Sequence, residues 1–524
     1  MFGSSSRIFY TGLAKFNVGA IKSCPKTKNI FFYISIFTFL VLVLYKQDYQ
    51  SINYISNILK IQFIKDTLVL ASGFEPVLSV YVTIAQPQNH GRFNDRSLTG
   101  ATLWLTMLGL TTTQSIPADI ETPPFKTLYK WKYVDFEFLS QKHRQNAIRT
   151  GKYKRENVLP LGIELWGDRI WVTIPRWRRS GVPATLATVS RSGGVTSPLL
   201  EPYPNWSFHR GHEYNCFNLT SVFRISADSC GRLWVLDSGQ IDSSAEKPKQ
   251  ICPPSIFVFD LYTDTLLARY PLPDRYVMQN SLFSNIIIDS RKDDCSDLHL
   301  YIADTWRFGL IVFRESDAQF WRFSSPLFFP DPLASNFTLH NVNFQWTDGI
   351  FGLALSPIND LNERILYFHS MSSYREFYVY TSVLRNPSKV KSHANDFLLL
   401  GESRGLNGQS SASAIDRRGV MFYGLVTKDT IGCWDSNKPY LKSTTGIVAK
   451  DSDNLIFPND IKIDSEIDQS VWVVTNKLPM FQATTLNMKE YNYRILYANT
   501  KEAVRNTVCD PSNFVPLIPF KDRT

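Results

Sequence analysis

The sequence lacks the residue spacings of the commonest metal and nucleophile sites. Its seven cysteines form no Cys-x-x-Cys pair, and this absence argues against a zinc site. It contains no Gly-x-Ser-x-Gly, no His-Glu-x-x-His and no phosphate-binding loop, which excludes the enzymes that depend on those motifs. Of the eight histidines, only His209 and His212 have a metal-like spacing, in "FHRGHEYN", which predicts a surface loop. We therefore expect no metal and no cofactor.

Basic residues are in excess, but the excess is confined to one part of the chain. The net charge is +9, and residues 1–115 hold 10 Lys and Arg against 4 Asp and Glu. The other 409 residues hold 46 basic against 43 acidic side chains, so they are nearly neutral. A nucleic-acid-binding protein would carry a basic helix or a basic stripe with aromatic residues. The sequence has neither, and we expect no nucleic-acid partner.

Long helical periodicity is also absent after about residue 150, and short strands take its place. In "DSCGRLWVLDSG" (228–239), a turn precedes a strand over Arg232–Asp237 and a second turn follows it. The scheme occurs six times, with inner strands that begin near residues 162, 221, 285, 348, 409 and 459. Four-stranded repeats at a period of roughly 50 to 65 residues predict propeller blades. The expected fold is an all-β, six-bladed β-propeller.

A hydrophobic leader precedes the predicted propeller and lies outside it. The 16-residue apolar run 29–44 follows four lysines, and it is slightly shorter than the ~20 residues of a membrane span. It fits a signal anchor with a cytosolic N-terminus, with a buried helix as the alternative. We assign 1–115 to the leader, 116–510 to the propeller and 511–524 to a C-terminal tail. The propeller is then lumenal or extracellular, and residues 29–44 could attach it to the membrane.

The blade arrangement predicts partners for six of the seven cysteines. One pair flanks strand ends that meet in an antiparallel hairpin, a second occupies corresponding turns of neighbouring blades, and a third would tie the tail to the fifth blade. The expected disulfides are Cys216–Cys252, Cys230–Cys295 and Cys433–Cys509, with Cys24 unpaired. Free buried thiols are the alternative. Three sequons predict glycosylation at Asn205, Asn218 and Asn336, in keeping with a secretory route.

Ring closure needs one strand from outside the six repeats. Propellers often close by pairing an N-terminal strand with the last blade, because this removes a free sheet edge. We expect the strand Lys132 to Phe138 to lie beside a strand of the blade formed by residues 459 to 497.

Several long motifs occur in an order that resembles one known family. They are "WKYVDFEF" (131–138), "PRWRRSGVPATLATV" (175–189), "CGRLWVLDSG" (230–239), "CPPSIFVFDL" (252–261), "DGIFGLALSP" (348–357), "GQSSASAIDRRGVMFYGLV" (408–426) and "FPNDIKI" (457–463). Together they resemble the insect yellow and major royal jelly protein family over roughly residues 128 to 510. The resemblance implies a secreted six-bladed propeller with a role in cuticle pigmentation and melanin metabolism, in development or in nutrition.

The resemblance also implies activities that the family does not share uniformly. Some members are similar to dopachrome-converting enzymes, and salivary members bind biogenic amines in the central channel. In those amine binders the last blade offers an Asn followed two residues later by Phe. This chain keeps Asn476 but has Leu478 at the Phe position, and Phe481 could substitute.

Candidate ligand-binding residues follow from the blade model, because inner strands line the channel and their leading ends form one rim. The candidates are Glu164, Arg224, Asp348, Phe351, Gln409, Ser411, Asn459, Asp460 and Asn476. A small aromatic amine or catechol-derived ligand needs a carboxylate, such as Asp348 or Asp460, and an aromatic wall, such as Phe351, Phe457 or Trp346. The alternative is that Asp348 and Asn459-Asp460 are only turn residues that begin strands.

Three functional hypotheses remain open. The first is a secreted yellow-type protein that binds such a ligand. The second is a dopachrome-converting tautomerase, in which Arg224 with Glu164 or Asp348 would supply a cation and a base. The third is a calcium-dependent hydrolase of the lactonase kind, with Glu164, Asn285, Asn459 and Asp460 as ligands. A purely structural cuticle protein without catalysis is the remaining alternative.

Overall fold

The structure is a computed structural model that describes residues 125–178, 180–194, 196–209, 216–245 and 247–512. The predicted leader with its apolar run 29–44, Cys24, His212 and the tail from residue 513 lie outside the described residues. Among the described residues, no helix combines the length and the apolar character needed to cross a bilayer.

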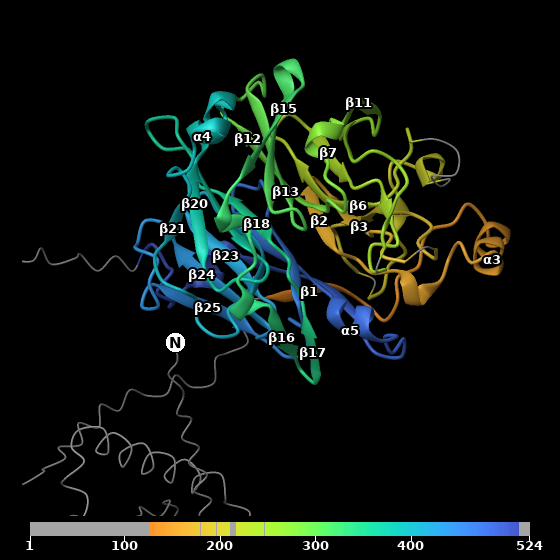
Figure 1. The fold of residues 1–524 in the computed structure, drawn as a ribbon. Helices are drawn as coiled ribbons and strands as arrows, with labels where there is room; N and C mark the ends of the chain where they lie inside the picture. The colour runs from red at the N-terminus through yellow and green to blue at the C-terminus, as the bar shows by residue number, and fades with distance from the viewer. Residues whose placement is uncertain (1–124, 179, 195, 210–215, 246, 513–524) are drawn as a thin grey trace, which may run out of the picture. The chain divides into compact units, whose positions relative to one another are not determined.

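Six four-stranded antiparallel sheets form the blades of the propeller (Figure 1). From its inner strand outward, the first blade consists of β2 (Gly162–Trp166), β3 (Arg169–Thr173), β4 (Leu186–Ser190) and β5 (Glu201–Pro202). The second consists of β6 (Val222–Ala227), β7 (Arg232–Asp237), β10 (Ser255–Asp260) and β11 (Leu266–Pro271). The third consists of β12 (Phe283–Ser290), β13 (Leu298–Asp304), β14 (Gly309–Arg314) and β15 (Gln319–Ser324). The fourth blade consists of β18 (Ile350–Leu355), β19 (Ile365–Ser370), β20 (Glu376–Tyr380) and β21 (Leu398–Leu400). The fifth consists of β22 (Ser410–Ile415), β23 (Val420–Leu425), β24 (Thr430–Asp435) and β25 (Thr445–Lys450). The sixth consists of β26 (Pro458–Ile463), β27 (Ser470–Thr475), β28 (Tyr493–Asn499) and β1 (Lys126–Trp131). The predicted six-bladed fold is confirmed.

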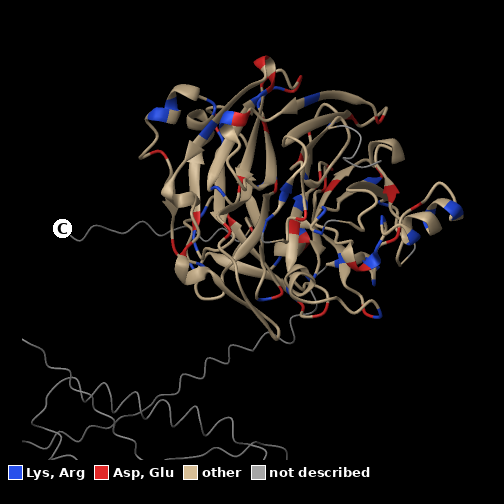
Figure 2. Ribbon diagram, turned by 45° about the vertical axis from the view of Figure 1, so that its right-hand side comes forward, with Lys and Arg blue, Asp and Glu red and all other residues tan. Residues whose placement is uncertain are grey.

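The described residues also form short hairpins and helices outside the six sheets. Two short hairpins, β8 (Gln240–Ile241) with β9 (Lys249–Gln250) and β16 (Asn336–Leu339) with β17 (Val342–Gln345), lie outside the six sheets. The helices are α3 (Gln141–Arg149), α4 (Thr381–Leu384), α5 (Leu478–Ala483) and α6 (Thr500–Val504). Figure 2 shows acidic and basic residues interspersed over the described ribbon.

As expected, an N-terminal strand closes the ring by pairing with the last blade, but this strand lies earlier in the sequence than the predicted one. β1 pairs with β28, from Lys126 opposite Tyr497 to Trp131 opposite Tyr493. The predicted closing strand, Lys132 to Phe138, is wrong. After Trp131 the chain bends and forms two backbone hydrogen bonds with Leu200, which directly precedes β5 of the first blade. The amide of Leu200 donates to the carbonyl of Asp135 at 3.0 Å, and its carbonyl accepts from the amide of Glu137 at 2.9 Å.

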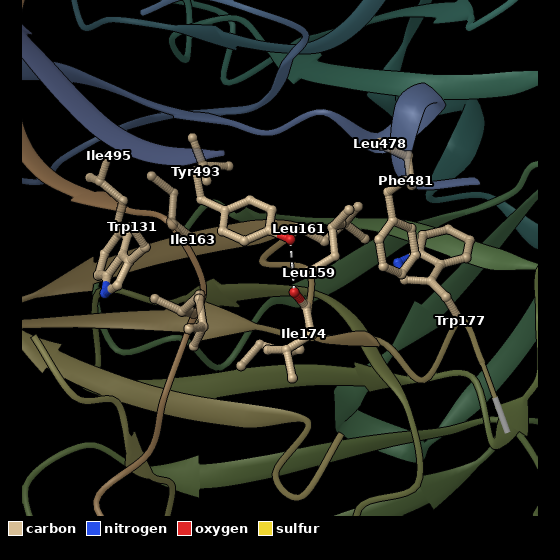
Figure 3. Packing of buried hydrophobic residues seen from close by; sticks show 14 of the residues in the cluster. Trp131, Leu159, Leu161, Ile163, Ile174, Trp177, Leu478, Phe481, Tyr493 and Ile495 are labelled. Atoms are coloured by element: carbon tan, nitrogen blue, oxygen red, sulfur yellow. Dashed lines mark hydrogen bonds between the residues drawn. The ribbon is translucent and has the colours of Figure 1, made fainter. Parts of the chain in front are cut away.

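Figure 3 shows how apolar side chains join the first blade to the last. Trp131 and Ile495 from the last blade lie beside Ile163 of β2, and all three are buried. The hydroxyl of Tyr493 donates a hydrogen bond of 3.0 Å to the carbonyl of Val158, just before β2. Burial of these side chains is the main stabilising contribution at the closing interface.

A repeated aspartate explains why the turns after the inner strands are so short. Asp228 accepts from the backbone amides of Cys230 and Arg232 at 3.0 and 2.9 Å. Asp416 in the fifth blade accepts from the amides two and four residues later in the same way. A carboxylate that binds nearby amides stabilises a tight turn. The turn that precedes the strand Arg232–Asp237 is therefore held by a single carboxylate.

The three expected disulfides are confirmed. Cys216–Cys252, Cys230–Cys295 and Cys433–Cys509 are bonded, with Cα atoms 5.5, 6.4 and 6.0 Å apart. The second links the turns of two neighbouring blades, and the third fixes the chain after α6 to β24. Because such bonds persist in oxidising compartments, they are typical of proteins outside the cytosol.

Candidate functional site

Two cavities lie at opposite ends of the inner strands. The leading-end cavity, of about 180 Å³, is lined by residues at or just before the starts of β2, β6, β12, β18 and β26, together with residues from nearby loops and α5. The trailing-end cavity, of about 210 Å³, is lined by residues further along all six inner strands. Neighbouring residues of one strand line different cavities. Ser284 and Asn459 line the leading-end cavity, whereas the next residues, Asn285 and Asp460, line the trailing-end cavity.

Among the described residues, Asp348 is the only charged one in the lining of the leading-end cavity. It lies just before β18, and the indole Nε1 of Trp306 donates to its Oδ1 at 3.0 Å. Burial raises the pKa of Asp348 to about 6, although the hydrogen bond from Trp306 acts in the opposite direction. A carboxylate with this pKa is mostly ionised at neutral pH and can still take up a proton, so it is suited to proton transfer.

Three hydrogen-bond donors of the same lining lack any partner among the described residues. They are Trp177 Nε1, Ser243 Oγ and Asn459 Nδ2, and all three atoms are buried. Buried polar atoms almost always have partners, so each exception needs an explanation. Because all three residues line the cavity, acceptor oxygens of a ligand bound there are the candidate partners.

The walls of this cavity are aromatic. Trp177, Phe223, Trp306, Trp346 and Phe351 line it. The rings of Trp177 and Phe223 meet edge to face, with centroids 5.1 Å apart. Figure 3 shows Trp177 beside Leu478 and Phe481 of α5. Such walls suit a flat aromatic ligand, which gains stacking and edge contacts there.

Arg224 lies behind this lining and is fully buried. Its Nη2 donates to Oδ1 of Asn459 at 2.8 Å, and its Nε lies 3.3 Å from Oδ1 of Asp460. Its guanidinium carbon is 5.7 Å from the ring centroid of Phe351. Burial lowers the pKa of Arg224, and the charge of Asp460 partly offsets this. The guanidinium thus contacts two residues of the leading-end lining and one of the trailing-end lining.

In the trailing-end cavity the polar side chains Glu164, Asn285 and Lys462 have partners within the protein. Oε2 of Glu164 accepts from Lys462 Nζ at 3.2 Å, and Oε1 accepts from the amide of Leu165 at 3.0 Å. The amide of Asn285 donates to the carbonyl of Phe351 at 2.8 Å. Among the described residues, Ser413 Oγ is the one buried polar side-chain atom of this lining without a partner.

The residues present do not fit a calcium site of the lactonase kind. Lys462 binds Glu164, and Arg224 binds both Asn459 and Asp460. Cations therefore already hold the oxygens that a calcium ion would need. The four proposed ligands are also divided between the two cavities.

Four of the predicted site residues line neither cavity: Arg224, described above, and three others that bind backbone carbonyls. Gln409 Nε2 donates to the carbonyls of Ala334 and Asn336, both at 3.1 Å, and so anchors the β16–β17 hairpin. The hydroxyl of Ser411 donates to the carbonyl of Pro458. Asn476 Nδ2 donates to the carbonyl of Pro160 at 2.8 Å. Of the nine predicted residues, the structure brings Asp348, Phe351 and Asn459 together at the leading-end cavity.

Metal-like groupings in the described residues have structural explanations. His209 is buried, its Nε2 lies 2.9 Å from the carbonyl of Tyr203, and burial lowers its pKa to about 3. Asp228, Cys230 and Cys295 lie close together, but the two cysteines are joined in a disulfide.

The sequence reasoning missed Trp177, Ser243 and Trp306. Trp177 lies in the motif 175–189 that follows β3, and Trp306 lies two residues after the end of β13. An aromatic residue just past the end of a second strand was a usable signal, because that end lies beside the start of the inner strand. Ser243, in the loop between β8 and β9, had no such signal.

Comparisons with known proteins agree with this fold. Residues 220–509 match the sequence model of the major royal jelly protein family. Dopaminechrome tautomerase of Drosophila melanogaster is 43% identical over 411 residues, which cover 77% of this chain and 88% of that protein. Protein yellow of Drosophila subobscura is 40% identical over 391 residues, covering 74% of this chain and 67% of that protein. Among solved structures, a luciferin-regenerating enzyme shares 12% identity at a TM-score of 0.38, over 67% of this chain and 92% of that one.

Proposed function

Because the chain belongs to the yellow and major royal jelly protein family, we propose that it acts in pigment metabolism by isomerising a decarboxylated aminochrome, such as dopaminechrome, in the leading-end cavity. The Drosophila relative named dopaminechrome tautomerase supports this choice of reaction. The single observation that carries the proposal is the combination of Asp348 with three unpartnered donors in one aromatic-walled cavity.

The reaction matches the groups in the cavity. Isomerisation to the aromatic dihydroxyindole takes the same kind of shift twice: a carbon–hydrogen bond of the saturated ring breaks, its electrons move through the ring system to a quinone oxygen, and that oxygen gains a proton. No electron leaves the molecule, so neither an oxidant nor a reductant is needed. Asp348 accepts the proton from carbon, and the donors Asn459 Nδ2, Ser243 Oγ and Trp177 Nε1 stabilise the charge that develops on oxygen. The protonated Asp348, directly or through water, then supplies the proton that the oxygen gains.

The charge of the lining favours a substrate without a carboxylate. Among the described residues, Asp348 is the only charged one that lines the cavity, so the carboxylate of dopachrome would meet a like charge and no cation within the lining itself. Like charges in a desolvated site repel strongly. We expect dopaminechrome to be the better substrate.

Amine binding without turnover is the second candidate, and the same carboxylate favours it. Asp348 can accept a hydrogen bond from the ammonium group of dopamine while the donors bind its catechol oxygens. A hydrogen bond to a charged group contributes about 1.5 to 3 kcal/mol, which corresponds to roughly ten- to a hundredfold in affinity.

One experiment separates these functions. The purified full-length protein is mixed with freshly prepared dopaminechrome or dopachrome, and loss of the chromophore is compared with the spontaneous rate. Calorimetry with dopamine is run in parallel. Turnover of dopaminechrome supports the enzyme, and saturable dopamine binding without turnover supports the carrier. If neither occurs at millimolar ligand, a structural cuticle or signalling role is the better explanation, and the site assignment is wrong.

The protein is directed to the secretory route, as its family and its three disulfides indicate. We propose that residues 29–44 act as a signal anchor. Glycosylation also stays a prediction: Asn205 and Asn336 are exposed, whereas Asn218 is half-buried.

A further inference from the structure

We infer that Arg224 is a positioning residue of the leading-end cavity, which fixes the amide of Asn459 so that its NH₂ group faces the ligand. This inference rests on the proposed function, because it assigns a role in the same site. Arg224 is not among the residues that line the cavity. It acts through Asn459, which does line it.

Donor chemistry determines which way the amide points. The guanidinium of arginine carries only donors, so the side-chain atom of Asn459 that lies 2.8 Å from Arg224 Nη2 must be the oxygen. The same Nη2 lies 3.0 Å from the backbone carbonyl of Asn459. With its oxygen held by Arg224, the amide presents Nδ2 elsewhere, and Nδ2 has no partner among the described residues.

Asp460 holds the guanidinium in this place. Its Oδ1 lies 3.3 Å from Arg224 Nε, and its Oδ2 accepts from the amide of Ile163 at 3.0 Å. The ring of Phe351 lies on another side of the guanidinium, 5.7 Å from its carbon. Arg224 is therefore restrained by its ion pair with Asp460, which is itself bonded to β2, and by packing against Phe351. A rotated Asn459 amide would face the guanidinium with hydrogens.

The positive charge also affects the reaction. It polarises the amide of Asn459 towards stronger donation and lies behind the donor that meets the quinone oxygen. That oxygen gains negative charge only as the carbon–hydrogen bond breaks, so the benefit is larger in the transition state than in the bound substrate. Groups of this kind change kcat more than KM.

The test replaces both charges of the buried pair, so that neither is left unpaired. Arg224→Met with Asp460→Asn should keep the fold, since a buried ion pair can be exchanged for neutral groups at little cost. The matched control is Glu164→Gln with Lys462→Met, which removes the ion pair of the trailing-end cavity. In the first variant, kcat for dopaminechrome should fall roughly 10- to 100-fold with KM within about threefold. The control should keep kcat within about twofold.

A single variant covers the case in which the double variant fails to fold. Asn459→Asp keeps an oxygen for Arg224 and replaces Nδ2 with a second oxygen, so it should fold and lose kcat to a similar degree. Unchanged kcat in a folded Asn459→Asp or Arg224→Met/Asp460→Asn protein would overturn the inference. So would a rise in KM alone, because it would assign Arg224 to ground-state binding.

A binding measurement distinguishes this inference from the proposed function. If the wild-type protein turns over no dopaminechrome, the proposed reaction fails, and dopamine becomes the probe. Its catechol oxygens would still meet Asn459 Nδ2. Arg224→Met/Asp460→Asn should then weaken dopamine binding at least about fivefold relative to the Glu164→Gln/Lys462→Met control. Equal affinities for the two folded variants would overturn the inference.

Discussion

The two ends of the channel are built from the same inner strands, yet their polar side chains differ in hydrogen bonding. At the trailing end, Glu164 and Lys462 bind each other and Asn285 binds backbone. At the leading end, Trp177, Ser243 and Asn459 keep donors without partners beside Asp348. Unpartnered buried donors destabilise a fold unless something else satisfies them. Size does not distinguish the cavities, and the difference in hydrogen bonding identifies the leading end as the site.

Asp348→Asn should produce the largest effect at the leading end. The substitution removes the proposed base while keeping an acceptor for Trp306, so kcat for dopaminechrome should fall at least about 100-fold. Thermal unfolding should be unchanged or shifted slightly upward, since a carboxylate with a raised pKa is destabilised by burial. Steady-state kinetics and calorimetric melting check both parts. Full activity in this variant would move the site elsewhere.

Glu164→Gln should give the opposite result at the trailing end. Lys462 loses its ionic partner in a largely buried position, which should cost about 1.5 to 3 kcal/mol in the free energy of unfolding. Turnover should stay within about twofold of the wild type. Denaturant unfolding and initial rates measure the two quantities. Loss of turnover in a stable Glu164→Gln protein would show that the trailing end takes part.

The pH profile should follow the pKa of Asp348. Its ionised form is the base, so kcat/KM should fall about tenfold per pH unit below pH 6 and level off above it. Trp306→Phe removes the hydrogen bond that lowers this pKa, and the acid limb should move to higher pH. Trp346→Phe is the control, since Trp346 lines the cavity but Trp306 makes the bond to Asp348. If the acid limb of Trp306→Phe stays at the same pH, the pKa that sets this limb does not belong to Asp348.

Gln409→Ala should have the smallest effect. Gln409 belongs to the leading rim but lines no cavity, and it anchors the β16–β17 hairpin through two backbone carbonyls. Trp346, which follows the hairpin, lines the cavity. Loosening the hairpin should raise KM by a few fold and leave kcat unchanged. A fall in kcat comparable with that of Asp348→Asn would mean that Gln409 contacts the substrate.

The fold could be predicted from the sequence because its signals are local and repeated. Short strands, turn residues and their period define the blades, and the blades then bring the six cysteines together in the observed pairs. The closing strand was misplaced because "KTLYKW" and "WKYVDFEF" both alternate like strands. The choice depends on contacts with Leu200, which no local pattern reveals.

The site was only partly predictable, for a different physical reason. The strand starts identified Asp348, Phe351 and Asn459, but also Gln409 and Asn476, whose side chains bind backbone. Whether a polar residue at a rim faces the cavity or a carbonyl depends on loops from other blades. Adjacent residues on one strand can also face different cavities, as Asn459 and Asp460 do.

A crystal structure of the protein with dopamine tests the central claim most directly. We predict one bound molecule in the leading-end cavity, with its ammonium group at Asp348 and a catechol oxygen within hydrogen-bond distance of Asn459 Nδ2. Dopamine bound beside Glu164 and Lys462 at the trailing end, with the leading-end cavity empty, would contradict the account.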